Sequence, residues 1–467
     1  MSQDRPLESF THVPCPGCGC VCDDITVSLG SSGLDSFEPE CSLGQQWFSR
    51  HCSKVEMPFR INDDAVTQDA AVTHAAKLLS SACYPLVYGL SRSATPGQRA
   101  AVELAEALRG VIDTTASLCH GPSIMAIQEV GEVTCSLGEI RNRADLVIFW
   151  GCNPGSSHPR HAERYSVDPC GRYVPAGRGD RTIVMIGQEN QIADWSLSPS
   201  GAKPDLTIAV PAGKDFEVLG QIRMCLNGTN VAGISDDIRQ LVDLMKSCRF
   251  GVVFFGLGLA GTKMWDFGER SNTGHINVAA LLKLIAELNA FTRFTARRMR
   301  LQGDVSGADN VMLWQTGYPF GVDFSRGYPR YNPGEFTAND LLERGDVDAI
   351  LLVGAETVSS FTDRALEHLR RIPSVVLDYP GTVAEFVPTV HITTSVYGIH
   401  APGTIYRMDN VPMSLQRLIS SEWPTDEDVL KEITTLYWKS SGRTADGMMS
   451  PAGCPQTNGL VTQECLM

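Results

Sequence analysis

Short, continuous runs of apolar residues recur along this chain, and longer amphipathic stretches separate them. Such runs are typical of strands buried on both faces of a parallel sheet. The pattern predicts strands at residues 85–90, 144–150, 182–186, 206–210, 250–255, 348–353, 374–378 and 390–392. It predicts helices at 95–108, 215–225 and 277–288, the first capped by Thr95 and started by Pro96. This alternation predicts an α/β fold with doubly wound parallel sheets.

Polar loops follow two of the predicted strands. Asn153, His158, Arg160 and His161 follow the strand that ends at residue 150, and Gly256 follows the strand 250–255. Ligands of open α/β sheets bind outside the carboxyl ends of strands. Histidine and arginine side chains there suit an anionic group, although the loop can equally be a solvated surface turn.

The segment 297–340 has no clean period and is dense in aromatic residues, arginine, glycine and proline. Long irregular segments within a domain are usually functional or disordered, and the aromatic content argues against disorder. We expect four parts in the chain: an N-terminal subdomain at 1–60, α/β domains at 61–245 and 246–435, and a disordered tail at 436–467.

Composition and charge narrow the function classes. The chain has 467 residues and a net charge of −14, so nucleic acid is a poor partner. It shows no secretory signal and no apolar run long enough to cross a membrane, so we expect a cytoplasmic protein without membrane contact. Fifteen cysteines in a reducing compartment indicate metal or redox chemistry.

Five of these cysteines lie within the first 41 residues. Cys15, Cys18, Cys22 and Cys41 have the spacing C-x2-C-x3-C-x18-C, and Cys20 is a fifth thiol within the run. Compact cysteine runs with one distant ligand are typical of iron–sulfur clusters, so the spacing favours a [4Fe–4S] cluster. Structural zinc, or free or disulfide-bonded cysteines, remain alternatives on spacing alone.

A second candidate site is the Cys119-His120 pair, which precedes Gly121 and Pro122 in a loop. A thiolate can bind a soft metal, and a neighbouring histidine can carry a proton near neutral pH. The alternative is a buried cysteine beside a histidine whose hydrogen bonds are satisfied.

Several long blocks resemble the molybdopterin oxidoreductases, and most closely the family of B-type subunits of formylmethanofuran dehydrogenase. The blocks lie at residues 116–123, 150–166, 316–335 and 403–409, and the resemblance covers roughly residues 12 to 420. It implies the molybdopterin oxidoreductase type of fold, with an N-terminal iron–sulfur loop subdomain.

The resemblance also implies roles for individual residues. Cys119 would bind tungsten or molybdenum carried by two pyranopterin guanine dinucleotides, His120 would carry a proton, and Arg300 would orient the carboxylate of formate or CO2. Cys15, Cys18, Cys22 and Cys41 would hold the [4Fe–4S] cluster. The residues assigned to cofactor binding are Gly121, Asn153, His158, Arg160, His161, Gly256, Thr404 and Arg407.

The implied reaction is the two-electron interconversion of CO2 and formate. The implied partners are an amidohydrolase-like subunit that handles the C1 carrier, a β-barrel subunit that caps the pterins, and a C-type subunit. The chain departs from the family at residues 187–190, where an Asp-Pro-Arg-x-Thr loop is usual, and at Leu301-Gln302, where Gly-His is usual. These departures favour an alternative, a non-redox structural subunit of a formyltransferase/hydrolase complex.

Overall fold

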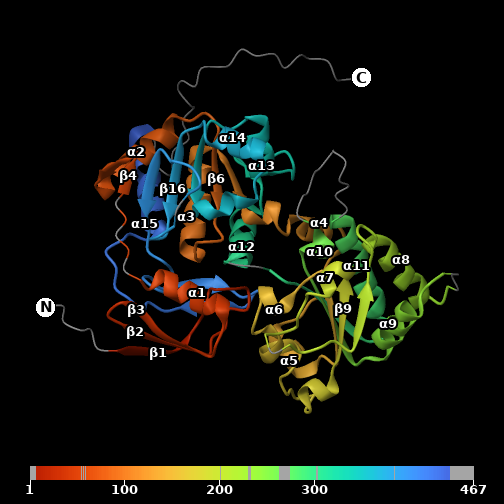
Figure 1. Cartoon of the computed structure of the whole chain (residues 1–467). Helices are drawn as coiled ribbons and strands as arrows, with labels where there is room; N and C mark the ends of the chain where they lie inside the picture. The colour runs from red at the N-terminus through yellow and green to blue at the C-terminus, as the bar shows by residue number, and fades with distance from the viewer. Residues whose placement is uncertain are drawn as a thin grey trace, which may run out of the picture.

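The computed structural model describes residues 7–53, 55, 57, 59–199, 201–229, 233–261, 274–300, 303–382 and 384–441. It is an α/β structure with two large, mainly parallel sheets and a small antiparallel sheet at the N-terminus (Figure 1). Leu301 and Gln302, at which the chain departs from the family pattern, lie outside the described residues. Among the described residues, no helix combines the length and the apolar character needed to cross a membrane.

The N-terminal sheet carries the cysteine loop. Its strands β1 (Glu8–Val13), β2 (Ile25–Gly30) and β3 (Gly33–Glu38) are antiparallel, and helix α1 (Ser42–His51) follows. The loop between β1 and β2 contains four of the five clustered cysteines, and Cys41 is the residue that precedes α1. The strand pairing therefore holds the loop at both of its ends.

The larger sheet has nine strands in the order β14-β13-β7-β6-β15-β16-β17-β4-β5. Its five central strands are parallel, and the two strands at each edge are antiparallel. The strands are β4 (Phe59–Ile61), β5 (Asp64–Val66), β6 (Pro85–Gly89), β7 (Val111–Thr114), β13 (Val322–Asp323), β14 (Arg330–Tyr331), β15 (Ala349–Val353), β16 (Ser374–Asp378) and β17 (Val390–Thr393).

Helices cover both faces of this sheet, as expected for a doubly wound fold. One face packs against α2 (Gln68–Ser81), α3 (Thr95–Leu108), α12 (Val305–Thr316) and α15 (Asp426–Ser441). The other face packs against α13 (Ala338–Arg344) and α14 (Asp363–Leu369). Burial on both faces explains why the central strands are almost wholly apolar.

The second large sheet is fully parallel, in the order β10-β9-β8-β11-β12. Its strands are β8 (Leu146–Trp150), β9 (Thr182–Gly187), β10 (Leu206–Ala209), β11 (Phe250–Phe255) and β12 (Arg293–Arg298). The associated helices are α4 (Gly121–Val130), α5 (Leu137–Arg143), α6 (Pro154–Ser157), α7 (Glu189–Ile192), α8 (Asp215–Leu226), α9 (Asp236–Ser247), α10 (Leu257–Ala260) and α11 (Gly274–Leu288). A ribbon of β18 (Gly403–Tyr406) and β19 (Pro412–Leu415) follows the nine-stranded sheet along the chain.

The order of strands reverses once among the parallel strands of each large sheet. The reversal lies between β6 and β15 in the nine-stranded sheet and between β8 and β11 in the five-stranded one. Ligands of open α/β sheets bind outside the carboxyl ends of strands at such points.

The sheets do not follow the predicted division at residues 245 and 246. The nine-stranded sheet combines strands from residues 59–114 with strands from 322–393, and the five-stranded sheet lies between these segments in sequence. The expected domains cut both sheets because apolar runs reveal strands but not their partners. The tail prediction also began too early, since α15 continues to Ser441; residues 442–467 lie outside the described residues.

Two local predictions need correction. The segment 297–340 is not irregular throughout, because it contains α12 and part of α13. Helix α3 begins as predicted, but its N-cap is Ala94, without a side-chain cap. The Thr95 hydroxyl instead donates to the carbonyl of Thr404 at 3.0 Å, so it joins the helix to the ribbon.

Candidate active site

A cavity of about 460 Å³ lies where the carboxyl ends of both large sheets meet. Its walls come from the loops after β6, β7 and β15 of one sheet, after β8 and β12 of the other, and from α1 and α12. The lining residues are Leu43, Tyr88, Ser91, Arg92, Thr115, Leu118, Cys119, His120, Ser156, Ser157, Arg300, Val305, Glu356, Thr357, Ser359 and Ser360. The volume is within the range of small-molecule and cofactor sites.

The structure brings Cys119, His120 and Arg300 together at this cavity. Cys119 follows a single 3-10 turn after β7, and its thiol is half-buried. Burial raises the pKa of the Cys119 thiol to about 11, and the guanidinium of Arg300 opposes this shift. The positive charge of Arg300 favours the thiolate, the form that binds metals, but burial outweighs it.

The turn that carries Cys119 is anchored by a buried carboxylate. Asp113, at the end of β7, accepts hydrogen bonds from the Ser117 hydroxyl at 2.6 Å and the Thr114 amide at 2.9 Å. It also accepts from the amides of Ala338 at 2.7 Å and Gly321 at 2.9 Å. Two distant segments therefore fix the loop that positions Cys119.

His120 and Arg300 share a contact with Asp309, which lies on α12. The Oδ2 atom of Asp309 lies 2.7 Å from His120 Nε2 and 3.3 Å from Arg300 Nη1. Burial lowers the pKa of His120 to about 4, so the imidazole is neutral near pH 7. A neutral histidine at the cavity wall can accept a proton.

Arg300 also contacts the cysteine loop through its backbone. His158 Nε2 donates to the carbonyl of Arg300 at 2.5 Å, and both residues are buried. A Cβ atom on Gly19 would approach the same carbonyl to 2.6 Å. The cysteine loop is therefore packed directly on the segment that carries Arg300, with no room for a side chain at residue 19.

The cysteine loop is compact, and most of its residues are buried. Burial, together with the thiols of Cys22, Cys18 and Cys41, raises the pKa of Cys15. The amide of Gly17 donates to the Cys15 sulfur at 3.4 Å. Within the described ranges, no group of three or more His, Cys, Asp or Glu side chains is placed so that it could hold a metal ion.

Cys20 and Cys22 differ in their surroundings. A hydrogen bond from Cys20, together with Arg164 and Arg160, lowers the pKa of Cys22 despite its burial. Hydrogen bonds to Cys18 and Cys22 raise the pKa of Cys20. Cys20 thus acts as a hydrogen-bond donor to Cys18 and Cys22.

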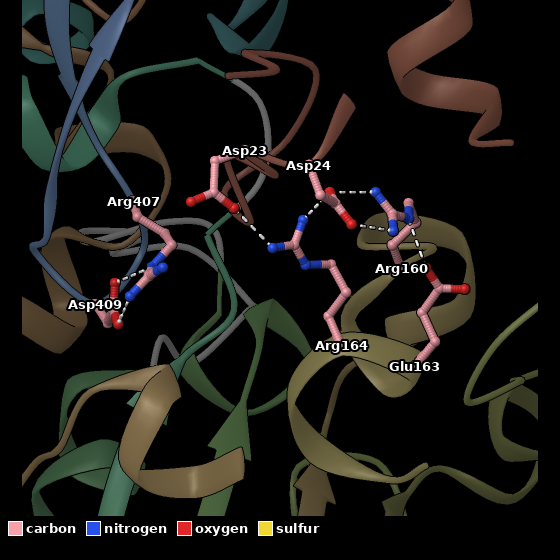
Figure 2. A network of polar contacts seen from close by, with 7 residues as sticks. All are labelled: Asp23, Asp24, Arg160, Glu163, Arg164, Arg407 and Asp409. Atoms are coloured by element: carbon pink, nitrogen blue, oxygen red, sulfur yellow. Dashed lines mark hydrogen bonds and ion pairs between the residues drawn. The ribbon is translucent and has the colours of Figure 1, made fainter. Parts of the chain in front are cut away.

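An ion-pair network links the cysteine loop to the five-stranded sheet (Figure 2). Asp24 accepts from both terminal nitrogens of Arg160 at 2.8 Å, and it also pairs with Arg164. Arg164 in addition pairs with Asp23 at 2.7 Å, and Arg160 pairs with Glu163 at 2.5 Å. These arginines hold the loop and add positive charge next to its thiols.

The other residues assigned to cofactor binding are spread around the carboxyl ends of the strands. His161 is fully buried, and its Nδ1 lies 2.9 Å from Ser166 Oγ. The Asn153 side chain accepts from the amide of Ser196 at 3.1 Å, and Arg407 pairs with Asp409 at 2.6 Å. Gly121 begins α4, and Gly256 packs on the backbone of Gly151 and Cys152. None of these five is among the described residues that line the cavity. The last residue assigned to cofactor binding is Thr404, whose carbonyl accepts a hydrogen bond from the Thr95 hydroxyl.

Two residues at the site, Asp113 and Asp309, have no counterpart in the predictions from sequence. Asp309 sits on a helix whose inward positions include Val305, Ala308 and Met312. An acidic residue on an apolar helix face indicates a functional or structural role. This signal could be found only if the helix 305–316 had been predicted.

Three curated proteins are similar to this chain in sequence. The chain is 38% identical over 421 residues to the B-type subunit of the tungsten-containing formylmethanofuran dehydrogenase 2 of Methanocaldococcus jannaschii, covering 87% of this chain and 93% of that protein. It is 36% identical to the protein of the same name from Methanococcus maripaludis, covering 89% of this chain and 95% of that protein. The B-type subunit of the formyltransferase/hydrolase complex Fhc of Methylorubrum extorquens is 25% identical, covering 62% of this chain and 73% of that protein. No protein-family model matches the chain.

Comparison of structures identifies a related fold. The chain superposes with a TM-score of 0.67 on a chain of the crystal structure of the formyltransferase/hydrolase complex FhcABCD from Methylorubrum extorquens in complex with methylofuran. The two chains are 22% identical, and the match covers 82% of this chain and 99% of the other. The identity and coverage of the first two sequence relatives are decisive, and they show that this chain belongs to the family of B-type subunits of formylmethanofuran dehydrogenase, an oxidoreductase.

Proposed function

We propose that this chain carries the site at which CO2 and formate are interconverted in a formylmethanofuran dehydrogenase complex. The observation that supports this most directly is the cavity at which Cys119, His120 and Arg300 meet. A soft thiolate, a proton acceptor and a cation are the groups required for carboxylate redox chemistry at a metal. The names of the two relatives, which specify tungsten, support the choice of metal.

The residues fit the proposed cofactors. Cys119 lies in the wall of the cavity, and a bound metal cation would oppose the effect of burial on the pKa of its thiol. The cysteine loop supplies buried thiols with two arginines nearby, which is the donor chemistry of an iron–sulfur cluster, and binding would bring together thiols that are not yet placed around a metal. When bound, tungsten or molybdenum on two pyranopterin guanine dinucleotides would exchange two electrons, and a [4Fe–4S] cluster on Cys15, Cys18, Cys22 and Cys41 would pass them onward.

We assign substrate binding and proton transfer to residues of this chain. Conversion of formate to CO2 releases one proton and two electrons. Arg300 binds and orients the carboxylate, and the neutral imidazole of His120 takes the proton. The apolar side chains of Leu43, Leu118 and Val305 line the same cavity and limit the access of water.

We assign the remaining residues of the predicted cofactor set to the shell around the cavity. His158 supports the backbone of Arg300, and Arg160 supports the cysteine loop. Gly121, Asn153 and Gly256 lie at the amino ends of α4, α6 and α10. His161, Thr404 and Arg407 complete the proposed set. Loss of such supporting contacts typically reduces metal affinity or activity by about 10–100-fold.

We propose that the chain works within a hetero-oligomer. The structural relative is part of a complex with four kinds of subunit, FhcABCD, which supports this assignment. The proposed partners are an amidohydrolase-like subunit for the C1 carrier, a β-barrel subunit over the pterins, and a C-type subunit.

One observation favours the alternative of a non-redox structural subunit. At the carboxyl end of β9, a Cβ atom on Gly187 would lie 2.6 Å from the ring of Trp195. The indole therefore closes over the strand end where the family's usual Asp-Pro-Arg-x-Thr loop would hold the nucleotide end of a pterin. The first relatives are nevertheless dehydrogenase subunits, so we rank redox activity first.

Metal analysis and EPR of the anaerobically purified complex test the proposal. We expect about one tungsten or molybdenum and about four irons for each copy of this chain. Cys119→Ser should reduce formate oxidation by at least about 100-fold, because serine cannot supply a thiolate. Cys83→Ser, at an exposed cysteine, is the matched control. Absence of both metals from active complex, or full activity in Cys119→Ser, would leave the structural role as the better account.

A further inference from the structure

Asp309 is the residue of α12 that touches both His120 and Arg300, two of the three proposed catalytic residues. It is only 4% exposed and lies on the inward face of the helix. One oxygen atom, Oδ2, lies 2.7 Å from His120 Nε2 and 3.3 Å from Arg300 Nη1. A single carboxylate oxygen thus joins a proton acceptor to a substrate-binding cation.

This contact determines which nitrogen of His120 carries the hydrogen atom. A carboxylate can only accept, so the nitrogen that faces Asp309 must donate, and Nε2 is protonated. In the neutral ring, Nδ1 is then the acceptor. Within the described residues Nδ1 is buried and has no hydrogen-bond partner. The hydrogen bond to Asp309 therefore leaves Nδ1 as the ring nitrogen that can accept a proton.

The same oxygen fixes one edge of the Arg300 guanidinium. Nη1 also donates to the hydroxyl of Ser306 at 2.7 Å, so two residues of α12 hold that nitrogen. Among the residues that the structure describes, the Nε atom of Arg300 is buried without a partner. One terminal nitrogen of the Arg300 guanidinium is thus held by the protein, while the side chain remains part of the cavity wall.

Helix α12 itself is held firmly at its first turn. Asp304 caps it by accepting from the amide of Gly307 at 2.9 Å. Asp304 also accepts from the amide of Tyr406 at 2.8 Å and from the side chain of Gln98 at 3.2 Å. The helix is therefore tied to both α3 and the ribbon, so Asp309 has a fixed place relative to the cavity.

We propose that Asp309 is a positioning residue for the CO2/formate reaction, fixing the proton-accepting nitrogen of His120 and the orientation of Arg300 with one carboxylate. This inference rests on the proposed function for the identity of the reaction. It predicts that loss of the charge on Asp309 impairs both carboxylate binding and proton transfer without removing the metal ligand.

Asp309→Asn in the full, metal-loaded complex tests the inference, with kinetics expressed per tungsten or molybdenum atom. We expect kcat to fall by about 10–100-fold and KM for formate to rise, while metal content and the EPR signal of the iron–sulfur cluster stay unchanged. Asp309→Glu restores the charge and should recover part of kcat. The matched control is Asp323→Asn, which removes another buried carboxylate that pairs with an arginine, Arg330, away from the cavity. It should leave kcat and KM per metal atom unchanged.

Crystal structures of the wild-type and Asp309→Asn complexes supply a readout that does not depend on activity. The inference expects the Arg300 guanidinium and the His120 ring to move in the variant. Wild-type positions together with kcat and KM within about twofold would overturn it, as would a loss of activity fully explained by a loss of metal. A wild-type complex without tungsten or molybdenum overturns the proposed function instead, and the two side-chain positions then decide the positioning role alone.

Discussion

At the scale of single residues, Cys20 and Cys22 are close neighbours with opposite electrostatic surroundings. The pKa of Cys22 is lowered by the hydrogen bond from Cys20 and by two arginines, whereas that of Cys20 is raised. Thiolates bind metals and thiols do not. We therefore propose Cys22 as a cluster ligand and Cys20 as a hydrogen-bond donor to the ligands.

We predict that Cys22→Ser removes the cluster and Cys20→Ser retains it. The first variant should fall from about four irons per chain to nearly none and lose the cluster's EPR signal. The second should keep its iron, because a serine hydroxyl can still donate. Iron analysis of the two purified complexes side by side checks this. Equal iron loss in both variants would show that Cys20 is itself a ligand.

His158 gives a prediction for the dependence of stability on pH. Burial lowers its pKa from 6.5 to about 4 in the folded chain, so the unfolded chain binds a proton more readily. Its contribution is fully present above pH 6.5 and is lost as the pH falls toward 4. At pH 5, about 1.5 pH units below the unfolded pKa, the loss amounts to about 2 kcal/mol.

His158→Gln should keep a donor for the carbonyl of Arg300 without this titration. The free-energy difference between wild type and variant should therefore shift in favour of the variant by about 2 kcal/mol between pH 7.5 and pH 5. Urea denaturation at both pH values measures the shift. A difference that does not change with pH would contradict the assignment.

The sequence could identify individual site residues only where they lie in recognisable local patterns. Cys119 and His120 are adjacent, and the cysteine spacing is itself a motif. Asp309 was missed because its partner His120 lies 189 positions away. Asp113 was missed for a similar reason, since it accepts from residues more than 200 positions along the chain.

At the scale of secondary-structure elements, predictions succeeded where an apolar run decided the structure. Strands β6, β8, β9, β11, β15 and β16 lie within a residue or two of their expected positions. Helix α12 was not recognised, because Gly307 and Asp309 interrupt the apolar pattern of its inward face. Both of these residues belong to the site. Gly307 packs on the capping carboxylate of Asp304, and Asp309 contacts His120 and Arg300.

Packing between the cysteine loop and the Arg300 segment leads to a further prediction. Gly19→Ala would place a Cβ atom 2.6 Å from the carbonyl of Arg300 and 3.2 Å from His158 Nε2. Both contacts are with buried, hydrogen-bonded groups, so the loop or the Arg300 backbone must move. We expect a loss of about 1–3 kcal/mol in stability and a higher KM for formate.

Gly30→Ala is the control for this variant, because a Cβ atom at that glycine of β2 meets nothing within 4 Å. Thermal unfolding and formate kinetics of the two variants should differ clearly. If Gly19→Ala unfolds and reacts like Gly30→Ala, the cysteine loop does not support Arg300 in the way that the packing indicates.

At the scale of the whole molecule, the N-terminal segment connects the two large sheets. Asp24 binds Arg160 and Arg164 on the side of the five-stranded sheet. Helix α1 reaches the nine-stranded sheet, where Arg50 donates to Thr382 at 3.3 Å. The sequence could not reveal this arrangement, because apolar patterns report which residues are buried and not which sheet or segment buries them.

From the position of Cys41 immediately before α1, we predict that this connection depends on the proposed cluster. A cluster on Cys15, Cys18, Cys22 and Cys41 would tie α1 to the loop that carries Asp24. Removal of iron should therefore let α1 and the cysteine loop move independently. This should loosen the contacts of the loop with residues 160–166 and those of α1 with residues 379–382. The edge strand β10 and helix α9 lie outside these contacts and should be unaffected.

Hydrogen–deuterium exchange of the complex before and after iron chelation measures this effect. We expect faster exchange at residues 15–51, at 160–166 and at 379–382, with unchanged exchange at 206–209 and 236–247. The Cys22→Ser complex should show the same pattern without a chelator, because it lacks a ligand and not merely the metal. Cys119→Ser should not show it, since Cys119 is not one of the four proposed cluster ligands. Exchange that increases only within residues 15–41 would mean that the cluster stabilises its own loop and does not join the sheets.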